Sequence, residues 1–219
     1  MPDIWITRTE PGAGRSARNW AAAGFAPRVA PVLRTVGVAT SAPWPEGYTP
    51  VFTSANGVRF AGVDAPRGPA FAVGDATAEA ARAAGFAPVV SARGDVEDLV
   101  ACIPADAGPL LHVRGERVAG DLVGGLRARG LRADSRVVYR TEAVQDLGPP
   151  VGDAEWIAVY SPFAAECVVR ILPQSWGGRI AALSARCAEP LRARRVVVAE
   201  RPCEAALIRA ALEAMEGRR

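Results

Sequence analysis

The sequence predicts an α/β fold in which parallel β-strands are covered by helices and a domain is duplicated. Short apolar runs alternate with alanine-rich amphipathic segments along the whole chain, which is typical of parallel sheets rather than of helical bundles or β-sandwiches. Passages in the two halves of the chain are also similar to each other, which indicates a repeat. At 219 residues the chain is long enough for one large domain or two small ones.

The apolar runs and amphipathic segments define the expected elements in order. Strands are expected over residues 4–8, 27–33, 50–53, 70–73, 88–90, 109–113, 137–144, 156–160, 179–183 and 195–199. Helices are expected over residues 13–23, 56–62, 76–84, 95–103, 117–129, 162–171, 185–193 and 203–216. Gly24, Gly85 and Gly130 directly follow expected helix ends, where glycine closes the last turn. Asp95 with Asp98 resembles a capped helix start.

The helix expected after Gly115 has a recognisable apolar face. Val118, Leu122 and Leu126 follow one another at four-residue spacing, which predicts that all three side chains face the core. The same spacing leaves the arginines of this segment toward solvent, namely Arg117, Arg127 and Arg129. We interpret these arginines as a solvated face rather than as a site.

The repeat joins strand ends to helix starts in both halves of the chain. Residues 51–56 (VFTSAN) are similar to residues 158–163 (AVYSPF), since each is a buried strand that ends in a hydroxyl pair and turns into a helix. Residues 72–79 (AVGDATAE) are similar to residues 182–189 (ALSARCAE), at nearly the same spacing. Ligands of open parallel sheets bind outside the carboxyl ends of strands, so we expect two equivalent corners and a cleft between two domains.

The positions of the repeats predict a discontinuous domain. The N-terminal strands must join one of the two repeat halves, so the chain would start in one domain, cross to the other and return. We therefore expect domain 1 at residues 1–35 plus 143–219 and domain 2 at residues 39–137. Extended segments at about 33–38 and 137–144 are expected to be the two crossing strands.

Composition excludes several classes of function. All 26 basic residues are arginine, and the absence of lysine removes Schiff-base chemistry and the phosphate-loop lysine. The net charge of +3, without basic tracts, argues against nucleic acid but allows a polyanionic small molecule. No segment is apolar enough for long enough to cross a membrane, and the N-terminus predicts no signal peptide, so we expect a cytoplasmic location.

Cysteine and histidine usage argues against a metal or redox centre. Cys102, Cys167, Cys187 and Cys203 form no CxxC pair, so buried free thiols are expected. The one histidine, His112, lies in an apolar run, where a hydrogen-bonded core or strand-end residue is expected rather than a ligand or a base. A metal cluster or a histidine-based triad is therefore not predicted.

Hydroxyl residues at the repeated corners are the first candidate site. Thr53-Ser54 and Tyr160-Ser161 stand at expected helix starts, where backbone N–H groups and the helix dipole favour carboxylates. The alternative is that they only begin the helices. Ser54, Asn56 and Ser161 would then be caps, with Pro162 at its favoured first position, and Ser184 allows the same two interpretations. The repetition favours binding.

Two further residues are candidates because of their positions. Arg8 ends the first strand, at the edge where parallel sheets bind ligands, and could hold a carboxylate or form an ordinary surface ion pair. Tyr139 lies in an expected crossing strand, where its phenol could donate a proton or simply pack in a β ladder. Gly12 and Gly14 do not complete a dinucleotide-binding GxGxxG, so no such site is predicted.

Nearly the whole chain resembles the uroporphyrinogen-III synthase family. The resemblance is carried by the order and spacing of several short passages rather than by any one of them. These are residues 6–8 (ITR), 30–33 (APVL), 52–58 (FTSANGV), 73–74 (VG) before 77–79 (TAE), 114–116 (RGE), 138–141 (VYRT) and 161–162 (SP).

The resemblance implies two flavodoxin-like domains, a two-stranded β linker, a hydroxymethylbilane substrate and no cofactor. Tyr139 corresponds to the family's candidate acid, which would assist departure of the terminal hydroxyl before ring D attacks and is inverted. Gly74 falls within a similar passage and is expected with the other corner residues to contact the substrate. The closed product would be uroporphyrinogen III, an intermediate of haem, cobalamin and chlorophyll biosynthesis. A monomer is expected, since flexible linkers ease opening and closing.

The second repeat departs from the family pattern. Residues 184–187 (SARC) stand where a glycine and paired threonines are common, and Tyr160 stands where a smaller hydroxyl residue is usual. Arg186 is therefore expected to supply a compensating carboxylate contact. The departures leave two alternatives open: a non-catalytic two-domain protein that binds a small anion, and an inactive paralogue of the synthase.

Overall fold

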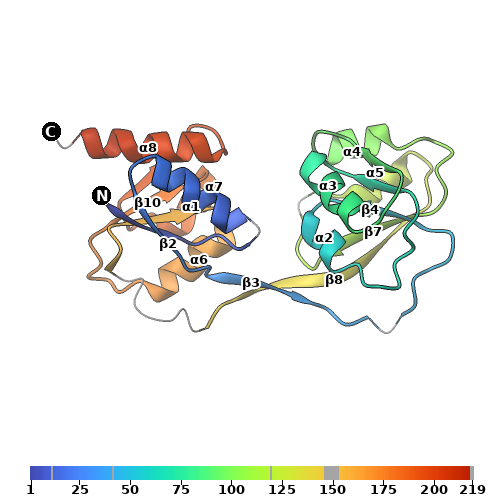
Figure 1. The fold of residues 1–219 in the computed structure, drawn as a ribbon, viewed down its shortest axis with the longest axis horizontal. Helices are drawn as coiled ribbons and strands as arrows, with labels where there is room; N and C mark the ends of the chain where they lie inside the picture. Colours follow the sequence, from blue (N-terminus) through green and yellow to red (C-terminus); the bar gives the residue numbers. More distant parts are fainter. Residues whose placement is uncertain (11, 41, 119, 146–152, 218–219) are drawn as a thin grey trace. The chain divides into compact units, whose positions relative to one another are not determined.

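A computed structural model describes residues 1–219 except 11, 41, 119, 146–152 and 218–219 (Figure 1). The chain forms two compact units. Unit 1 comprises Met1–Arg34 and Glu142–Arg219, and unit 2 comprises Thr35–Thr141. Each unit contains one β-sheet. The strands of unit 1 are paired in parallel, and so are the central strands of unit 2, which confirms the predicted α/β class.

Unit 1 is a five-stranded sheet with helices on both faces. Its elements are β1 (Asp3–Ile6), α1 (Gly12–Ala22), β2 (Ala26–Val29), β9 (Trp156–Val159), α6 (Pro162–Ile171), β10 (Arg179–Ala182), α7 (Ala185–Ala188), the 3₁₀ turn η2 (Glu189–Leu191), β11 (Val196–Val198) and α8 (Glu204–Glu216). The strands lie in the order β11-β10-β9-β1-β2. Counted along unit 1 this is the order 2-1-3-4-5, which is the flavodoxin-like order.

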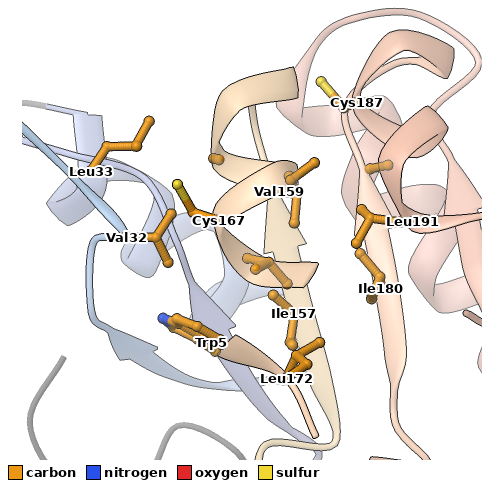
Figure 2. Packing of buried hydrophobic residues seen from close by; sticks show 14 of the residues in the cluster. Trp5, Val32, Leu33, Ile157, Val159, Cys167, Leu172, Ile180, Cys187 and Leu191 are labelled. Atoms are coloured by element: carbon orange, nitrogen blue, oxygen red, sulfur yellow. The ribbon is translucent and has the colours of Figure 1, made fainter. Parts of the chain in front are cut away.

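Two apolar clusters hold the helices of unit 1 to the sheet. Ile4 and Ile6 of β1 pack with residues of α1 and α8 on one face, whereas Trp5 packs with residues of α6, α7 and η2 on the other. Figure 2 shows Trp5 beside Ile157 and Val32 in the second cluster. The Trp5 indole donates to the Ala30 carbonyl at 2.6 Å, which satisfies its N–H in the core.

Unit 2 repeats this architecture. Its elements are β4 (Thr49–Phe52), α2 (Ala55–Arg59), β5 (Ala70–Ala72), α3 (Asp75–Ala83), β6 (Val89–Ser91), α4 (Val96–Cys102), β7 (Leu110–Gly115) and α5 (Leu122–Ala128), and β3 (Leu33–Gly37) and β8 (Ala133–Ala143) complete its sheet. The strand order is β3-β8-β7-β4-β5-β6. Helices α2 and α3 cover one face, and α4 and α5 cover the other.

The two sheets have the same spatial order but a different chain order. In unit 1 the chain starts at β1-β2 and ends at β9-β10-β11, whereas in unit 2 it starts at β4-β5-β6 and ends at β7-β8. Strands β4 and β5 are therefore the counterparts of β9 and β10. The similar passages of the sequence fall on these counterpart strands.

Strands β3 and β8 carry the chain from one unit to the other. They are neighbours in the second sheet, and each contains a boundary between the units. The Arg34 guanidinium pairs with Glu142 at 3.0 Å, and the Val144 N–H donates to the Val32 carbonyl at 2.9 Å. The predicted two-stranded β connection is confirmed by this pairing.

Most expected elements are present, and the departures have local causes. The strand expected over residues 27–33 is two strands, β2 and β3, because the chain leaves one sheet and enters the other. The helix expected over 117–129 begins only at Leu122, capped by the side chain of Asp121, which accepts from the Gly124 N–H at 2.9 Å. Val118 precedes the helix and is half exposed, and residue 119 lies outside the described residues.

The helix-end signals are largely confirmed, whereas the cysteine prediction is partly wrong. Gly24, Gly85 and Gly130 have positive φ, and Asp95 with Asp98 forms a capping box. Arg127 and Arg129 are exposed as predicted. Their guanidinium groups nevertheless donate to backbone carbonyls, Arg127 to that of Ala133 and Arg129 to that of Ile103. Cys167 and Cys187 are buried, but Cys102 is half-buried and Cys203 is exposed, because Cys203 precedes the first turn of α8.

Candidate active site

Four helix starts at the carboxyl ends of counterpart strands have nearly the same backbone conformation. The residues are Ser54 before α2 (φ −157°, ψ 152°), Gly74 before α3 (−155°, 171°), Ser161 before α6 (−151°, 154°) and Ser184 before α7 (−158°, 167°). This extended conformation turns each strand into a helix within one residue. The repeat seen in the sequence is therefore also a repeat of local geometry.

In unit 2, Tyr139 and Ser54 lie together. The Tyr139 hydroxyl is 2.9 Å from Ser54 Oγ, although the two residues are 85 positions apart. Ser54 Oγ also accepts from the Gly57 N–H at 3.1 Å. A serine hydroxyl has one proton and two acceptor sites, so Ser54 can donate to the phenol oxygen while it accepts from Gly57. In that arrangement the phenol proton is left for a ligand.

Two glycines allow Tyr139 to reach this corner. A Cβ at Gly115 would lie 2.6 Å from the Tyr139 ring, so the ring lies directly over β7. The register of β7 and β8 shifts between Arg114 and Gly115, which pairs Gly115 with Tyr139. A Cβ at Gly57 would lie 2.6 Å from the Val113 carbonyl oxygen, so only glycine lets α2 approach β7 this closely. Sequence reasoning included both glycines in similar passages without giving them a role.

Thr53 is hydrogen-bonded to the only histidine of the sequence. Thr53 Oγ1 and His112 Nε2 are 2.9 Å apart, and the tautomer decides which group donates. Only 5% of the His112 surface is exposed. Burial, with a smaller contribution from the charge of Arg114, lowers the pKa of His112 to about 4. His112 is thus a neutral, hydrogen-bonded strand residue, as predicted, and it fixes the Thr53 hydroxyl.

Asn56 and Gly74 complete the corner residues of unit 2. Asn56 is half-buried in the first turn of α2, and no described residue forms a hydrogen bond with its side-chain amide. Gly74 has an extended backbone, and a Cβ there would meet nothing within 4 Å. The start of α3 therefore lacks a side-chain cap and has open space beside it. Both positions leave polar groups available to a ligand.

In unit 1, the corner hydroxyls are occupied by capping. Ser161 Oγ accepts from the Ala164 N–H at 3.1 Å, and Pro162 occupies the first turn of α6. Ser184 Oγ accepts from the Cys187 N–H at 3.4 Å and donates to the Cys187 sulfur at 3.3 Å. These contacts match the capping interpretation, and each hydroxyl retains an acceptor or donor site for a further partner.

Arg186 lies apart from these hydroxyls. Its side chain is exposed on α7. It lines a shallow groove of about 350 Å³ together with Arg192 and with Val198 of the edge strand β11. The described contacts do not bring Arg186 to Ser161 or Ser184.

Arg8 lies over the ring of Tyr160. The guanidinium carbon is 5.2 Å from the ring centroid, a cation–π arrangement. The phenol accepts from the Trp20 indole N–H at 2.8 Å and donates to Glu204 at 3.0 Å. The Tyr160 hydroxyl is therefore committed within unit 1, so the pair Tyr160-Ser161 does not reproduce the pair Thr53-Ser54. Sequence reasoning did not anticipate the Trp20 and Glu204 contacts.

The part of the chain that the structure describes offers neither a metal site nor a membrane span. No group of three or more His, Cys, Asp or Glu side chains is placed there to hold a metal ion. No described helix is long and apolar enough to cross a bilayer.

A recess of about 620 Å³ lies at the amino ends of the unit 1 strands and is lined among others by Trp156 and Trp176. It is at the opposite end of the sheet from the corner residues.

Comparisons with solved structures agree with this fold. The chain is similar in fold to the uroporphyrinogen-III synthetase of Helicobacter pylori, with a TM-score of 0.66 and 15% identity over 98% of this chain and 100% of that one. It is also similar to a mutant uroporphyrinogen III synthase from the extremely thermophilic bacterium Thermus thermophilus, with a TM-score of 0.55 and 17% identity over 99% of this chain and 100% of that one. At these identities the likeness shows the fold.

Sequence families give the assignment. No curated protein sequence matches the chain. The family model of uroporphyrinogen-III synthase HemD, in contrast, matches residues 15–209, which include the whole sheet of unit 2, every strand of unit 1 except β1, and the corner residues of both units other than Arg8. The chain therefore belongs to the uroporphyrinogen-III synthase HemD family.

Proposed function

We propose that Tyr139 is the acid in the reaction that family membership assigns to this chain. That reaction, in tetrapyrrole biosynthesis, closes the linear tetrapyrrole hydroxymethylbilane to uroporphyrinogen III, with loss of water and inversion of ring D. The observation that carries the proposal is the 2.9 Å contact between the Tyr139 hydroxyl and Ser54 Oγ. This contact places a phenol at the carboxyl end of β4, where open parallel sheets bind ligands.

The proposed step begins at the terminal hydroxymethyl group. The phenol proton of Tyr139 passes to the hydroxyl oxygen, the carbon–oxygen bond breaks and water leaves, while the pyrrole nitrogen lone pair stabilises the azafulvenium cation. Ser54, donating to the phenol oxygen, stabilises the phenolate that remains. Ring D then attacks through its substituted carbon, and the spiro intermediate fragments and rejoins inverted. Loss of a ring proton restores the phenol.

The remaining corner residues are proposed to position the substrate. Hydroxymethylbilane is a flexible polycarboxylate that can close unaided without inversion, so holding its productive conformation is the main contribution of the protein. Candidate contacts in unit 2 are Thr53, Ser54, Asn56 and Gly74. Candidate contacts in unit 1 are Arg8, Ser161, Pro162, Ser184 and Arg186, and of these the guanidinium of Arg8 is the best placed by its surroundings.

We further propose that the chain acts as a monomer in the cytoplasm without a cofactor. The modest net charge of +3 and the composition support a freely diffusing enzyme with a small anionic substrate. Light scattering should give a mass near 22.9 kDa that does not change with concentration. A stable dimer would contradict the proposed monomer.

The test is product analysis with freshly generated hydroxymethylbilane. The purified protein should yield mainly the type III isomer without added cofactor, as resolved by chromatography after oxidation. Tyr139→Phe should lower kcat by about a hundredfold, at the low end for a general acid because the substrate is already activated. Only the spontaneous type I product from the wild-type protein would instead support a binding protein or an inactive paralogue, and an unchanged kcat for Tyr139→Phe would remove the acid role.

A further inference from the structure

The corner of unit 1 has a half-buried arginine, Arg8, that forms no close ion pair with any described residue. Strand β1 is paired with β9, and Thr7, just after β1, donates its N–H to the Ala158 carbonyl at 3.3 Å. The next residue, Arg8, consequently lies beside Tyr160 at the carboxyl ends of both strands. Among the residues that the structure describes, no carboxylate forms an ion pair with Arg8 and no hydrogen bond of its guanidinium is seen. Its planar array of donors is free for a ligand.

The ring of Tyr160 supports this guanidinium and is itself rigidly held. Trp20, which is fully buried, donates to the Tyr160 hydroxyl at 2.8 Å, and that hydroxyl donates to Glu204 at 3.0 Å. Asn19 also donates to Glu204, at 2.6 Å. These contacts connect the first helix, the corner and the start of α8. The phenol oxygen therefore has both a donor and an acceptor partner within unit 1, while Arg8 contacts the ring.

The charges around this contact are stable across the physiological range. Burial raises the pKa of Tyr160, so the phenol stays neutral. Burial works against ionisation of Glu204, but the hydrogen bonds from Asn19 and Tyr160, together with the charge of Arg8, lower its pKa overall. Glu204 is thus an anion that accepts the Tyr160 proton in a hydrogen bond. The network is fixed rather than switchable.

Gly12 gives the arginine its room. A Cβ at Gly12 would collide with the Arg8 side chain, which crosses the start of α1 at that point. Arg8 therefore lies between the start of α1 and the Tyr160 ring, and both contacts restrict its side chain. A side chain ordered before binding loses less entropy when it binds an anion.

We propose that Tyr160 is a positioning residue that holds Arg8 to bind a carboxylate of the substrate. The Tyr160 hydroxyl is hydrogen-bonded within unit 1, and its ring contacts the guanidinium of Arg8. This inference rests on the proposed function, because it names a substrate contact of the same reaction.

A double-mutant cycle tests whether Tyr160 acts through Arg8. Tyr160→Leu should raise KM for hydroxymethylbilane about fivefold, the factor expected from a cation–π contact, with little change in kcat. Arg8→Gln should raise KM at least as much, and the double variant should be no worse than Arg8→Gln alone. Tyr160→Phe keeps the ring and should recover most of the affinity. If Tyr160→Leu leaves KM unchanged, or if the two effects multiply, the proposal is wrong.

Another tyrosine of the chain provides a matched control. Tyr48 carries Arg132 at 5.2 Å from its ring centroid and donates to Asp134 at 2.5 Å, so it has the same kinds of partner as Tyr160. Tyr48 precedes β4, at the amino end of the strand rather than at the corner. Tyr48→Leu should therefore lower the melting temperature as Tyr160→Leu does but leave KM unchanged. A KM increase as large for Tyr48→Leu would show that the effect is structural and overturn the proposal.

A binding readout separates this inference from the proposed function. Uroporphyrin III, the stable oxidised form of the product, keeps the carboxylates and should quench tryptophan fluorescence on binding. Its Kd should follow the same pattern across the variants as KM does. If the wild-type protein makes only type I product but the Kd pattern holds, the proposed reaction fails and the Arg8–Tyr160 inference stands. Equal Kd values for wild type and Tyr160→Leu would refute the inference whatever the activity.

Discussion

Replacing Ser54 by alanine removes two hydrogen bonds, and their effects can be separated. The cap from the Gly57 N–H, at 3.1 Å, contributes about 1 kcal/mol to stability. The contact with the Tyr139 hydroxyl, at 2.9 Å, becomes a bond to an anion when the phenol gives up its proton. Bonds of that kind are worth roughly 1.5–3 kcal/mol, which corresponds to a loss of about 10- to 150-fold in kcat.

Ser161→Ala is the matched comparison, because Ser161 caps its helix at the same 3.1 Å in the same backbone conformation. No phenol of the described residues lies on Ser161 Oγ. Urea unfolding should show similar losses of stability for both variants, whereas steady-state assays of type III formation should show a large kcat loss for Ser54→Ala and mainly a KM increase for Ser161→Ala. Equal kcat losses would refute the reasoning and leave Ser54 as a cap only.

Three further predictions concern other positions. Gly57→Ala should lower the free energy of unfolding in urea by about 1–3 kcal/mol and also reduce kcat, because the new methyl group would lie 2.6 Å from the Val113 carbonyl oxygen and displace α2. Gly74→Ala is the control and should not change stability, because a Cβ at Gly74 meets nothing within 4 Å. Equal effects of the two variants would contradict this account. The pKa of His112 is lowered to about 4 from 6.5, so the unfolded chain binds the extra proton between these values. Stability should fall by about 3 kcal/mol as the pH falls from 6.5 to 4, and His112→Phe should flatten this part of the profile, while an unchanged slope would rule His112 out as its cause. Cys203, the exposed thiol, should react first with a thiol reagent, and Cys203→Ser should remove the fast phase; a persistent fast phase would show that another thiol is open.

Periodicity was sufficient to predict most of the fold because both sheets are buried on two faces. Strands such as β9, with every residue buried, appear in sequence as continuous apolar runs. The strand expected over residues 137–144 begins four residues earlier in the structure, because β8 starts at Ala133. Its first residues include Asp134 and Ser135, which look like a loop in sequence but pair with Leu111 and His112 of β7. Pairing with a neighbour, rather than local apolarity, makes these residues a strand.

The candidate site was only partly predictable. Hydroxyls at helix starts follow from local patterns, so Ser54 and Ser161 could be identified as corner residues. The contact of Tyr139 with Ser54 could not, because it depends on a register shift opposite Gly115 that no local pattern encodes. The orientation of Tyr160 was equally hidden, since its partner Glu204 comes from a helix 44 positions later. Contacts across strands and helices are set by packing, which a single sequence does not specify.

The chain order of the two sheets has a consequence for synthesis on the ribosome. Unit 2 is continuous from Thr35 to Thr141, so all of its strands emerge together and can pair at once. Strand β1, in contrast, is made before unit 2 but lies between β2 and β9, and the Thr7 hydroxyl donates to the carbonyl of Ala158, 151 positions later. The N-terminal segment must therefore remain incomplete, with one side of β1 unpaired, while the whole of unit 2 is translated. The last part of the nascent chain, rather than the first, completes the domain that contains Arg8.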